Sequence, residues 1–200
     1  TCFGHNVIFP EAMISTAKSI GIKLQVGLVL QNKKSNYAKE FGDYLRLGLS
    51  IRDKYKDLPS LKFAFSIDQN DSVKSEQLSI TAKYANELEM PIHIVFHNNA
   101  DVKFVLESLE SAGALNEQTQ LSGIQSIADD FCCTLKRYNC KVLHTPLTTH
   151  YPDEYFRTLL KREENNPNFS FATANPNKFS TLDVFELMKV TGILARINLY

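Results

Sequence analysis

Short, nearly continuous apolar runs recur along the chain, and each ends at polar residues. The clearest run covers residues 22–30 and stops at Gln31. Runs of this length are typical of strands that are buried on both faces. The same pattern predicts strands at 61–67, 92–96, 141–144 and 169–173. Two more strands are expected, one at 1–3 and one, on a weaker pattern, within 118–127.

Helical patterns separate these runs. Pro10 suits the first turn of a helix that Gly21 would close. Ser75 can cap a helix whose apolar positions recur every three or four residues, and Asp101 can cap another. Ser180, with an acidic residue three positions later, resembles a capping box for the last helix. Strands and helices therefore alternate along the chain.

Strict alternation with short loops predicts parallel strands joined by right-handed crossovers. The two architectures that fit are an open doubly wound sheet and a (β/α)8 barrel. No glycine-rich phosphate loop follows any strand, which disfavours the open nucleotide-binding sheet. About seven strand–helix units can be counted, and the chain starts at Thr1 within the first strand. We therefore predict an α/β fold, an incomplete TIM-type barrel that lacks its first unit, as a single domain over residues 1–200.

Composition narrows the possible partners and location. Hydrophobic residues make up 44% of the chain, and Lys+Arg and Asp+Glu both number 22, so the net charge is zero. This balance argues against binding to nucleic acid. The sequence shows neither an apolar run long enough for a membrane span nor a signal-peptide pattern. The four cysteines have no zinc-ligand spacing and are expected to be free thiols, with one of the adjacent Cys132 and Cys133 packing inward. A cytoplasmic protein is predicted.

Four segments resemble one known family, and they occur in the family's order. They are TCFGHNVIFPEA, the YLRLGLSIRDKYKD stretch with the LKFAF that follows it, SEQLSITAKYANELEMPIHI, and KRYNCKVLHTP. Together they resemble the metal-dependent amidohydrolase superfamily, in its branch of methylthioadenosine/S-adenosylhomocysteine deaminases and chlorohydrolases. The resemblance runs from the family's second barrel strand to the helix after its eighth strand. It implies a (β/α)8 barrel.

The resemblance also implies a metal site. In this superfamily a zinc or related divalent ion sits at the carboxyl ends of the strands and activates a water that displaces an amine from a purine-type ring. Its ligands are a His-x-His on the first strand, one His on each of the fifth and sixth strands, and an Asp on the eighth. The first-strand pair would fall before Thr1.

The other site positions carry residues that cannot perform this chemistry. The fifth-strand His corresponds to Val95, and the nearby Glu that relays a proton corresponds to Asn98. The sixth-strand His falls at about Gly123, and the eighth-strand Asp corresponds to Ala174. Valine, glycine and alanine side chains donate no electron pair, and an amide does not titrate in the useful range. The sequence therefore predicts no catalytic residue and no bound zinc or other cofactor. Whether the chain is an enzyme stays open.

Four polar side chains remain near strand ends: Asp68, His93, His97 and His144. His93 and His97 share strand parity with Val95, so all three can face the barrel interior or its mouth. The two histidines could hold a stray metal, but inherited pocket residues that form hydrogen bonds are the favoured interpretation. Asp68 is either an added ligand or, more in keeping with its place, a turn residue. We predict that the four form a vestigial substrate pocket without a metal.

Three functions are compatible with these observations. The leading one is a degenerate, catalytically inactive amidohydrolase-like protein that binds a small molecule or acts as a scaffold. An alternative is a fragment of a metal-dependent hydrolase or deaminase acting on purine-type C–N bonds. The third is an oligomeric interaction protein, because a barrel without its first unit exposes two strand edges. Such edges predict a homodimer, or a partner chain that completes the barrel.

Overall fold

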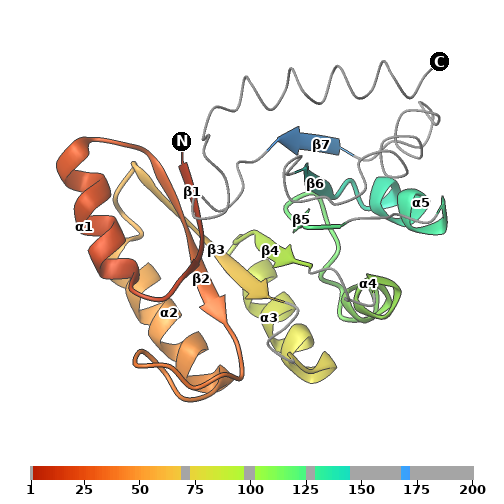
Figure 1. Cartoon of the computed structure of the whole chain (residues 1–200), viewed down its shortest axis with the longest axis horizontal. Helices are drawn as coiled ribbons and strands as arrows, with labels where there is room; N and C mark the ends of the chain where they lie inside the picture. Colours follow the sequence, from red (N-terminus) through yellow and green to blue (C-terminus); the bar gives the residue numbers. More distant parts are fainter. Residues whose placement is uncertain (1, 69–72, 97–101, 125–128, 145–167, 172–200) are drawn as a thin grey trace. The chain divides into compact units, whose positions relative to one another are not determined.

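The computed structural model describes residues 2–68, 73–96, 102–124, 129–144 and 168–171 (Figure 1). The chain divides into two compact units. Unit 1 comprises Thr1–Val95 and Glu107–Ala114, and unit 2 comprises Phe96–Leu106 and Leu115–Tyr200. Within the described ranges, no helix is both long and apolar enough to cross a membrane.

Unit 1 is built from four parallel strands in sequence order. The strands are β1 (Cys2–Val7), β2 (Leu24–Leu30), β3 (Leu61–Asp68) and β4 (Ile92–Val95). The connections are α1 (Pro10–Ile20), α2 (Phe41–Tyr55) and α3 (Ser75–Glu87). Figure 1 shows these helices in red, orange and yellow beside the strands that they connect. Each helix returns the chain to the same end of the sheet, as parallel pairing requires.

Unit 2 repeats this plan with shorter strands. Its strands are β5 (Gln120–Ser122), β6 (Lys141–His144) and β7 (Asn168–Phe171), and β6 pairs in parallel with both of the others. The helix α5 (Asp129–Arg137) connects β5 to β6. The boundary between the two units passes through α4 (Val102–Ser111). A parallel α/β fold is therefore confirmed, in agreement with the sequence pattern.

The two faces of the unit 1 sheet carry different side chains. Along β2, β3 and β4 the register pairs Leu28 with Phe65, and Phe65 with Ile92. Because alternate residues share a face, one face holds large apolar side chains. Its members are Leu24, Val26, Leu28, Leu30, Leu61, Phe63, Phe65, Ile67, Ile92 and Ile94, and all are buried. The opposite face holds small or polar residues, among them Gly27, Ala64, Ser66 and His93.

The large apolar face is the one that packs against helices. The α-carbon of Gly48 in α2 lies so close to Leu28 that a Cβ added there would meet the Leu28 side chain at 3.4 Å. Ile14 and Ala17 of α1, and Leu78 and Ala82 of α3, are buried as well. Burial of these side chains is the main favourable term in folding this unit. We call the large apolar side chains of β2, β3 and β4 on this face the helix-facing layer.

Most predicted elements are found where the sequence pattern places them, with ends that shift by one to three residues. β6 has the predicted bounds, and β5 lies inside the weakly predicted segment 118–127. The first strand is longer than predicted and runs to Val7. Gly21 closes α1 in the left-handed conformation with φ of 72°, as expected of a glycine at this position. The expected caps at Asp101 and Ser180 lie outside the described residues.

The predicted cap at Ser75 is wrong. α3 begins at Ser75 itself, and the residue that precedes its first turn is Lys74. The backbone N–H of Lys74 donates to Oε1 of Gln77 at 2.9 Å. The Gln77 amide also exchanges two hydrogen bonds with Asn32, at 2.9 and 3.0 Å. A side chain within the helix therefore satisfies the helix start, and Ser75 is not needed for that role.

Candidate functional site

The candidate site lies at the carboxyl ends of the strands. Parallel pairing brings these ends to one edge of each unit's sheet, and barrel enzymes place their sites at that edge. In unit 1 the edge includes Asp68 at the end of β3 and Val95 at the end of β4, which are neighbours in the register. In unit 2 it includes Ser122 at the end of β5 and His144 at the end of β6.

Two of the four predicted pocket residues lie on one face of unit 1. The register pairs Ser66 with His93 and Asp68 with Val95, so all four residues share the face opposite the helix-facing layer. This confirms the shared parity that was predicted for His93 and Val95. His93 is 3% exposed and Ser66 is fully buried, whereas Asp68 and Val95 are half-buried. The edge therefore presents Asp68 and Val95, with a buried polar pair beneath them.

The structure does not test the placement of the other two predicted pocket residues in this group. His144 ends β6 in unit 2, where the register pairs it with Phe171. His97 lies outside the described residues, as do Asn98 and Ala174. The predicted four-residue pocket thus stays a prediction, and its described part in unit 1 consists of Asp68 and His93.

Gly123 adopts a conformation that excludes any side chain. Its φ is +76°, in the left-handed region that favours glycine. A Cβ at this position would collide with the carbonyl oxygen of Phe96 and lie 3.1 Å from its carbonyl carbon. Phe96 is held there, because its N–H donates to the carbonyl oxygen of Ser122 at 2.8 Å. The backbone of Phe96 therefore occupies the space that a side chain at position 123 would need.

The residues present do not fit the divalent metal that the resemblance implies. Val95 offers only methyl groups at the position of the fifth-strand ligand, and Gly123 has no room for an imidazole. A register slip of one or two residues does not change this, because no histidine occurs between His97 and His144. Within the described ranges, no three His, Cys, Asp or Glu side chains are grouped as ligands of one ion.

The thiols of unit 2 match their predicted roles as free cysteines. None of Cys132, Cys133 and Cys140 forms a disulfide bond. In α5, Cys132 is buried and Cys133 is exposed, which confirms that one of the two packs inward. Burial raises the pKa of the Cys140 thiol to about 11, and a hydrogen bond from the Asn116 backbone opposes this rise. A buried thiol with a raised pKa is a poor nucleophile, so Cys140 is a packing residue.

Sequence reasoning missed one hollow at the carboxyl end of β2. The segment 31–40 joins β2 to α2, and a cavity of about 210 Å³ opens between its second half and the first turns of α2. The apolar run signals the end of β2 at Gln31 but says nothing about how the following polar residues fold. The adjacent Lys33 and Lys34 were the only feature of this loop in the sequence that could have drawn attention to a charged hollow there.

Comparisons with known proteins agree with the fold and with the resemblance. No protein-family profile matches the chain. A 5-methylthioadenosine/S-adenosylhomocysteine deaminase of Saccharophagus degradans is 24% identical over 98% of this chain and 46% of its own length. Among solved structures, an adenosine deaminase from Xanthomonas campestris with bound zinc has a TM-score of 0.82 and 19% identity over 98% of this chain. Escherichia coli guanine deaminase has a TM-score of 0.81 and 13% identity over 99%.

The chain covers 47% of the Xanthomonas deaminase and 49% of the guanine deaminase, so it spans about half the length of the proteins that it matches. The match nevertheless extends over almost all of this chain. These findings confirm the predicted TIM-barrel type of fold and agree with the predicted resemblance: the chain is similar in sequence to proteins named methylthioadenosine/S-adenosylhomocysteine deaminases and similar in fold to solved deaminases.

Proposed function

We propose that this chain keeps the deaminase scaffold but does not carry out metal-dependent hydrolysis, and that it binds a purine-type small molecule at the carboxyl ends of its strands. The observation that carries the first part is the pair Val95 and Gly123. Each stands where the resemblance implies a metal ligand, and Gly123 is held in a backbone conformation that admits no side chain.

Hydrolysis of this class needs a specific set of groups. A catalytic zinc requires about three protein ligands and an open position, where it lowers the pKa of its bound water to about 7. A proton carrier must then deliver a proton to the leaving amine. Asn98 stands where the resemblance implies the Glu that has this role, and an amide does not titrate in the range needed of a general acid or base. The chain would therefore bind a ligand without converting it.

The second part of the proposal rests on the polar residues that remain. Asp68 is at the edge in a position to accept hydrogen bonds, and the buried Ser66 and His93 continue a polar path beneath it. The shape of a barrel pocket depends on its loops and not on its metal. The name of the Saccharophagus relative points to methylthioadenosine and S-adenosylhomocysteine as the ligands to test first.

The first experiment measures chemistry and metal together. Purified chain is incubated with methylthioadenosine, S-adenosylhomocysteine, adenosine or guanine, and ammonia release is compared with that of a heat-killed sample. We expect no release above this control, and substoichiometric zinc, iron and manganese by elemental analysis. One tightly bound metal per chain together with ammonia release would overturn the proposed inactivity.

A second experiment asks whether the loss can be reversed. The double variant Val95→His, Ala174→Asp adds two of the implied ligands and leaves Gly123 and Asn98 unchanged. Two ligands make only a half-site, so weak metal uptake without turnover is expected. Measurable deamination by this variant would contradict the proposal.

Ligand binding is tested by calorimetry with methylthioadenosine. Asp68→Asn should weaken binding several-fold if the edge of unit 1 contacts the ligand. Asp53→Asn is the matched control, because Asp53 is an exposed carboxylate on α2 that pairs with Arg52. Equal affinities for the two variants would exclude Asp68 from the pocket.

A further inference from the structure

The loop between β2 and α2 is fixed by a network of hydrogen bonds. Tyr44, in the second turn of α2, is fully buried, and its hydroxyl accepts a hydrogen bond from the Gln31 side chain. The same hydroxyl lies 2.7 Å from Oγ of Ser35 and 3.0 Å from the carbonyl oxygen of Lys33. Oγ of Ser35 accepts hydrogen bonds from the N–H groups of Tyr37 and Ala38. A loop held at this many points keeps its shape before a ligand arrives, which lowers the entropic cost of binding.

The cavity beside this loop has a positive lining. The charged residues that border it are Lys34, Lys39, Arg46 and Asp43. Three of these residues are cations and one is an anion, although the whole chain is neutral. The volume of about 210 Å³ is below the range of roughly 300 to 1,000 Å³ that holds drug-sized ligands. The cavity therefore suits a small charged group, not a whole nucleoside.

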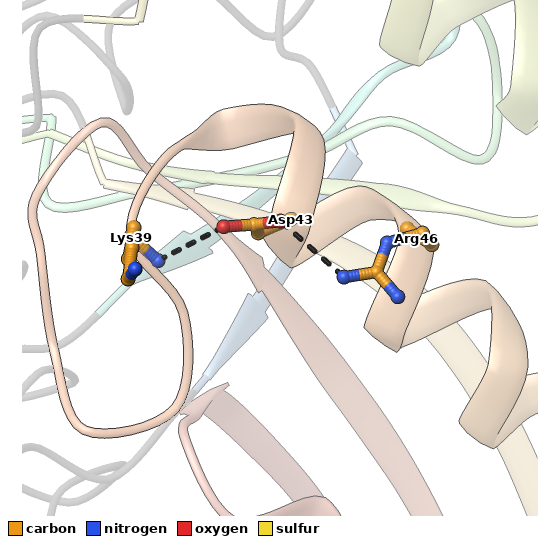
Figure 2. Close-up of polar contacts among 3 residues, drawn as sticks. All are labelled: Lys39, Asp43 and Arg46. Atoms are coloured by element: carbon orange, nitrogen blue, oxygen red, sulfur yellow. Dashed lines mark hydrogen bonds and ion pairs between the residues drawn. The ribbon is translucent and has the colours of Figure 1, made fainter.

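One carboxylate already lies between two donors at this cavity. Figure 2 shows Asp43 between Lys39 and Arg46. The backbone N–H of Lys39 donates to Oδ2 of Asp43 at 3.4 Å, and the Arg46 guanidinium contacts Oδ1 at 3.3 Å. Charge-assisted hydrogen bonds in proteins are usually about 2.7 to 2.9 Å long. Both contacts are much longer, and the Arg46 side chain is 72% exposed, so Asp43 holds these donors weakly.

We propose that this cavity binds a small oxyanion, a phosphate or a carboxylate group, on Arg46, Lys34 and Lys39. In this arrangement Asp43 acts as a weak internal competitor that the incoming anion displaces from the guanidinium. An Arg guanidinium has a planar fork of donors that matches both kinds of oxyanion, and flanking lysines add charge without fixing geometry. The proposal is independent of the proposed purine pocket, because it uses only residues of the β2–α2 loop and α2.

The test measures binding of two probes to the full chain at low ionic strength, where exposed charges are least screened. Inorganic phosphate is titrated in one series and malonate in the other, with calorimetry and with amide NMR of Lys39 as readouts. We expect saturable binding of one anion per chain, with a Kd on the order of 1 mM. The tighter probe identifies whether a phosphate or a carboxylate is the preferred group.

Three variants decide whether the binding is local. Arg46→Gln should weaken binding about fivefold or more, and Asp43→Asn should strengthen it about threefold, because the competitor is removed. Lys62→Gln is the matched control: it removes the same charge from an exposed residue near the amino end of β3. The control should leave the affinity within a factor of about two.

Several results would overturn the proposal. They are the absence of saturable binding of either probe, an equal loss in Lys62→Gln and Arg46→Gln, or an Asp43→Asn variant that binds no better than the unmodified chain. The thermal unfolding curves of all three variants should match that of the unmodified chain, because Arg46 and Lys62 are exposed and Asp43 is only half-buried.

Discussion

The helix-facing layer of unit 1 and the carboxyl ends of the strands follow different rules. The layer consists of large, fully buried side chains that alternate without interruption along β2, β3 and β4. At the carboxyl ends, Asp68 and Val95 are half-buried, and Val95 stands at a position where the resemblance implies a metal ligand. The first region depends on volume and apolarity, and the second on individual functional groups. A chain can therefore lose the second set while it keeps the fold that the first set stabilises.

Gly123 is an exception to this division between core positions and strand-end positions. It lies just after the end of β5, among the expected site positions, yet it is as constrained as any core residue because of its positive φ and its contact with Phe96. The strand ends therefore include a position where the backbone conformation and a close contact allow only glycine.

The sharpest test of the comparison is Phe65→Ala against Val95→Ala. Phe65 is fully buried in the helix-facing layer, so its truncation should lower the free energy of unfolding by about 3 to 5 kcal/mol. Val95 is half-buried at the strand end, and its truncation should cost less than about 1 kcal/mol. Urea denaturation followed by circular dichroism measures both values. Similar losses would mean that the two regions are not distinct in their contribution to stability.

A glycine series tests the exception. Gly123→Ala should lose about 2 to 4 kcal/mol of unfolding free energy, because it adds steric overlap to backbone strain. Gly113 also has a positive φ, 66°, but open space around it, so Gly113→Ala should cost about 1 kcal/mol. Gly42, in α2, has neither constraint, and Gly42→Ala should gain up to about 1 kcal/mol. If Gly123→Ala behaves like Gly113→Ala, the Phe96 contact has no energetic role.

Tyr44 and Tyr37, both in the β2–α2 region, allow a comparison of a hydroxyl that forms hydrogen bonds with one that forms none among the described residues. Tyr44→Phe removes the centre of the loop network and leaves the buried Gln31 amide with fewer partners, which should cost about 1 to 3 kcal/mol. The Tyr37 hydroxyl is buried and has no hydrogen-bond partner among the described residues. Tyr37→Phe should therefore leave the unfolding free energy unchanged or raise it by about 1 kcal/mol. Loss of stability in Tyr37→Phe at pH 7 would show that this hydroxyl does have a partner.

The same phenol gives a pH dependence of known sign. Burial raises the pKa of Tyr37 above its ordinary value of 10.0, and the nearby Glu11 and Tyr44 add to the rise. Because the folded state favours the neutral phenol, its contribution to stability is complete below pH 10 and is lost as the pH rises through the folded pKa. We expect the unfolding free energy of the unmodified chain to fall more steeply above pH 10 than that of Tyr37→Phe. Parallel curves would contradict this assignment.

Thiol labelling compares buried and exposed cysteines in unit 2, and it is the prediction with the smallest expected effect on stability. In a Cys2→Ser background at pH 8, one thiol should react rapidly, and Cys133→Ser should remove that fast phase. Cys132 and Cys140 should react only after unfolding, since both are buried and the pKa of Cys140 is raised to about 11. Rapid labelling of two thiols in the folded chain would show that α5 does not bury Cys132.

The sequence predicted the strands and helices whose hydrophobic pattern is regular. Apolar runs identify β2 and β3 because most residues on both faces of these strands are buried, which leaves a nearly continuous apolar pattern. β1 was underestimated, because Gly4, His5 and Asn6 interrupt its apolar pattern. The cap of α3 was misassigned by one residue, because the helix begins at Ser75 and the residue before it is Lys74. Gln77 accepts from the N–H of Lys74, and no local pattern reports the contact of Gln77 with Asn32.

The candidate site could be predicted only in part. The resemblance predicts that Val95 and a position at about Gly123 replace metal ligands, which stays a prediction, and strand parity placed His93 on the same face as Val95. The conformation of Gly123 and the cavity beside the β2–α2 loop depend on contacts between segments far apart in the chain or within an irregular loop, which periodicity does not record. The predicted dimer through open strand edges stays a prediction.

The contact between Gly123 and Phe96 has a consequence for the history of this chain. A codon change that restored a histidine at position 123 would first meet a folding penalty, because the imidazole has no place beside the Phe96 carbonyl. Selection for chemistry could act on such a variant only after the chain between β4 and β5 had moved. Under the proposed function, reversal would thus require compensating changes before the useful one, so a ligand at this position is easier to lose than to regain.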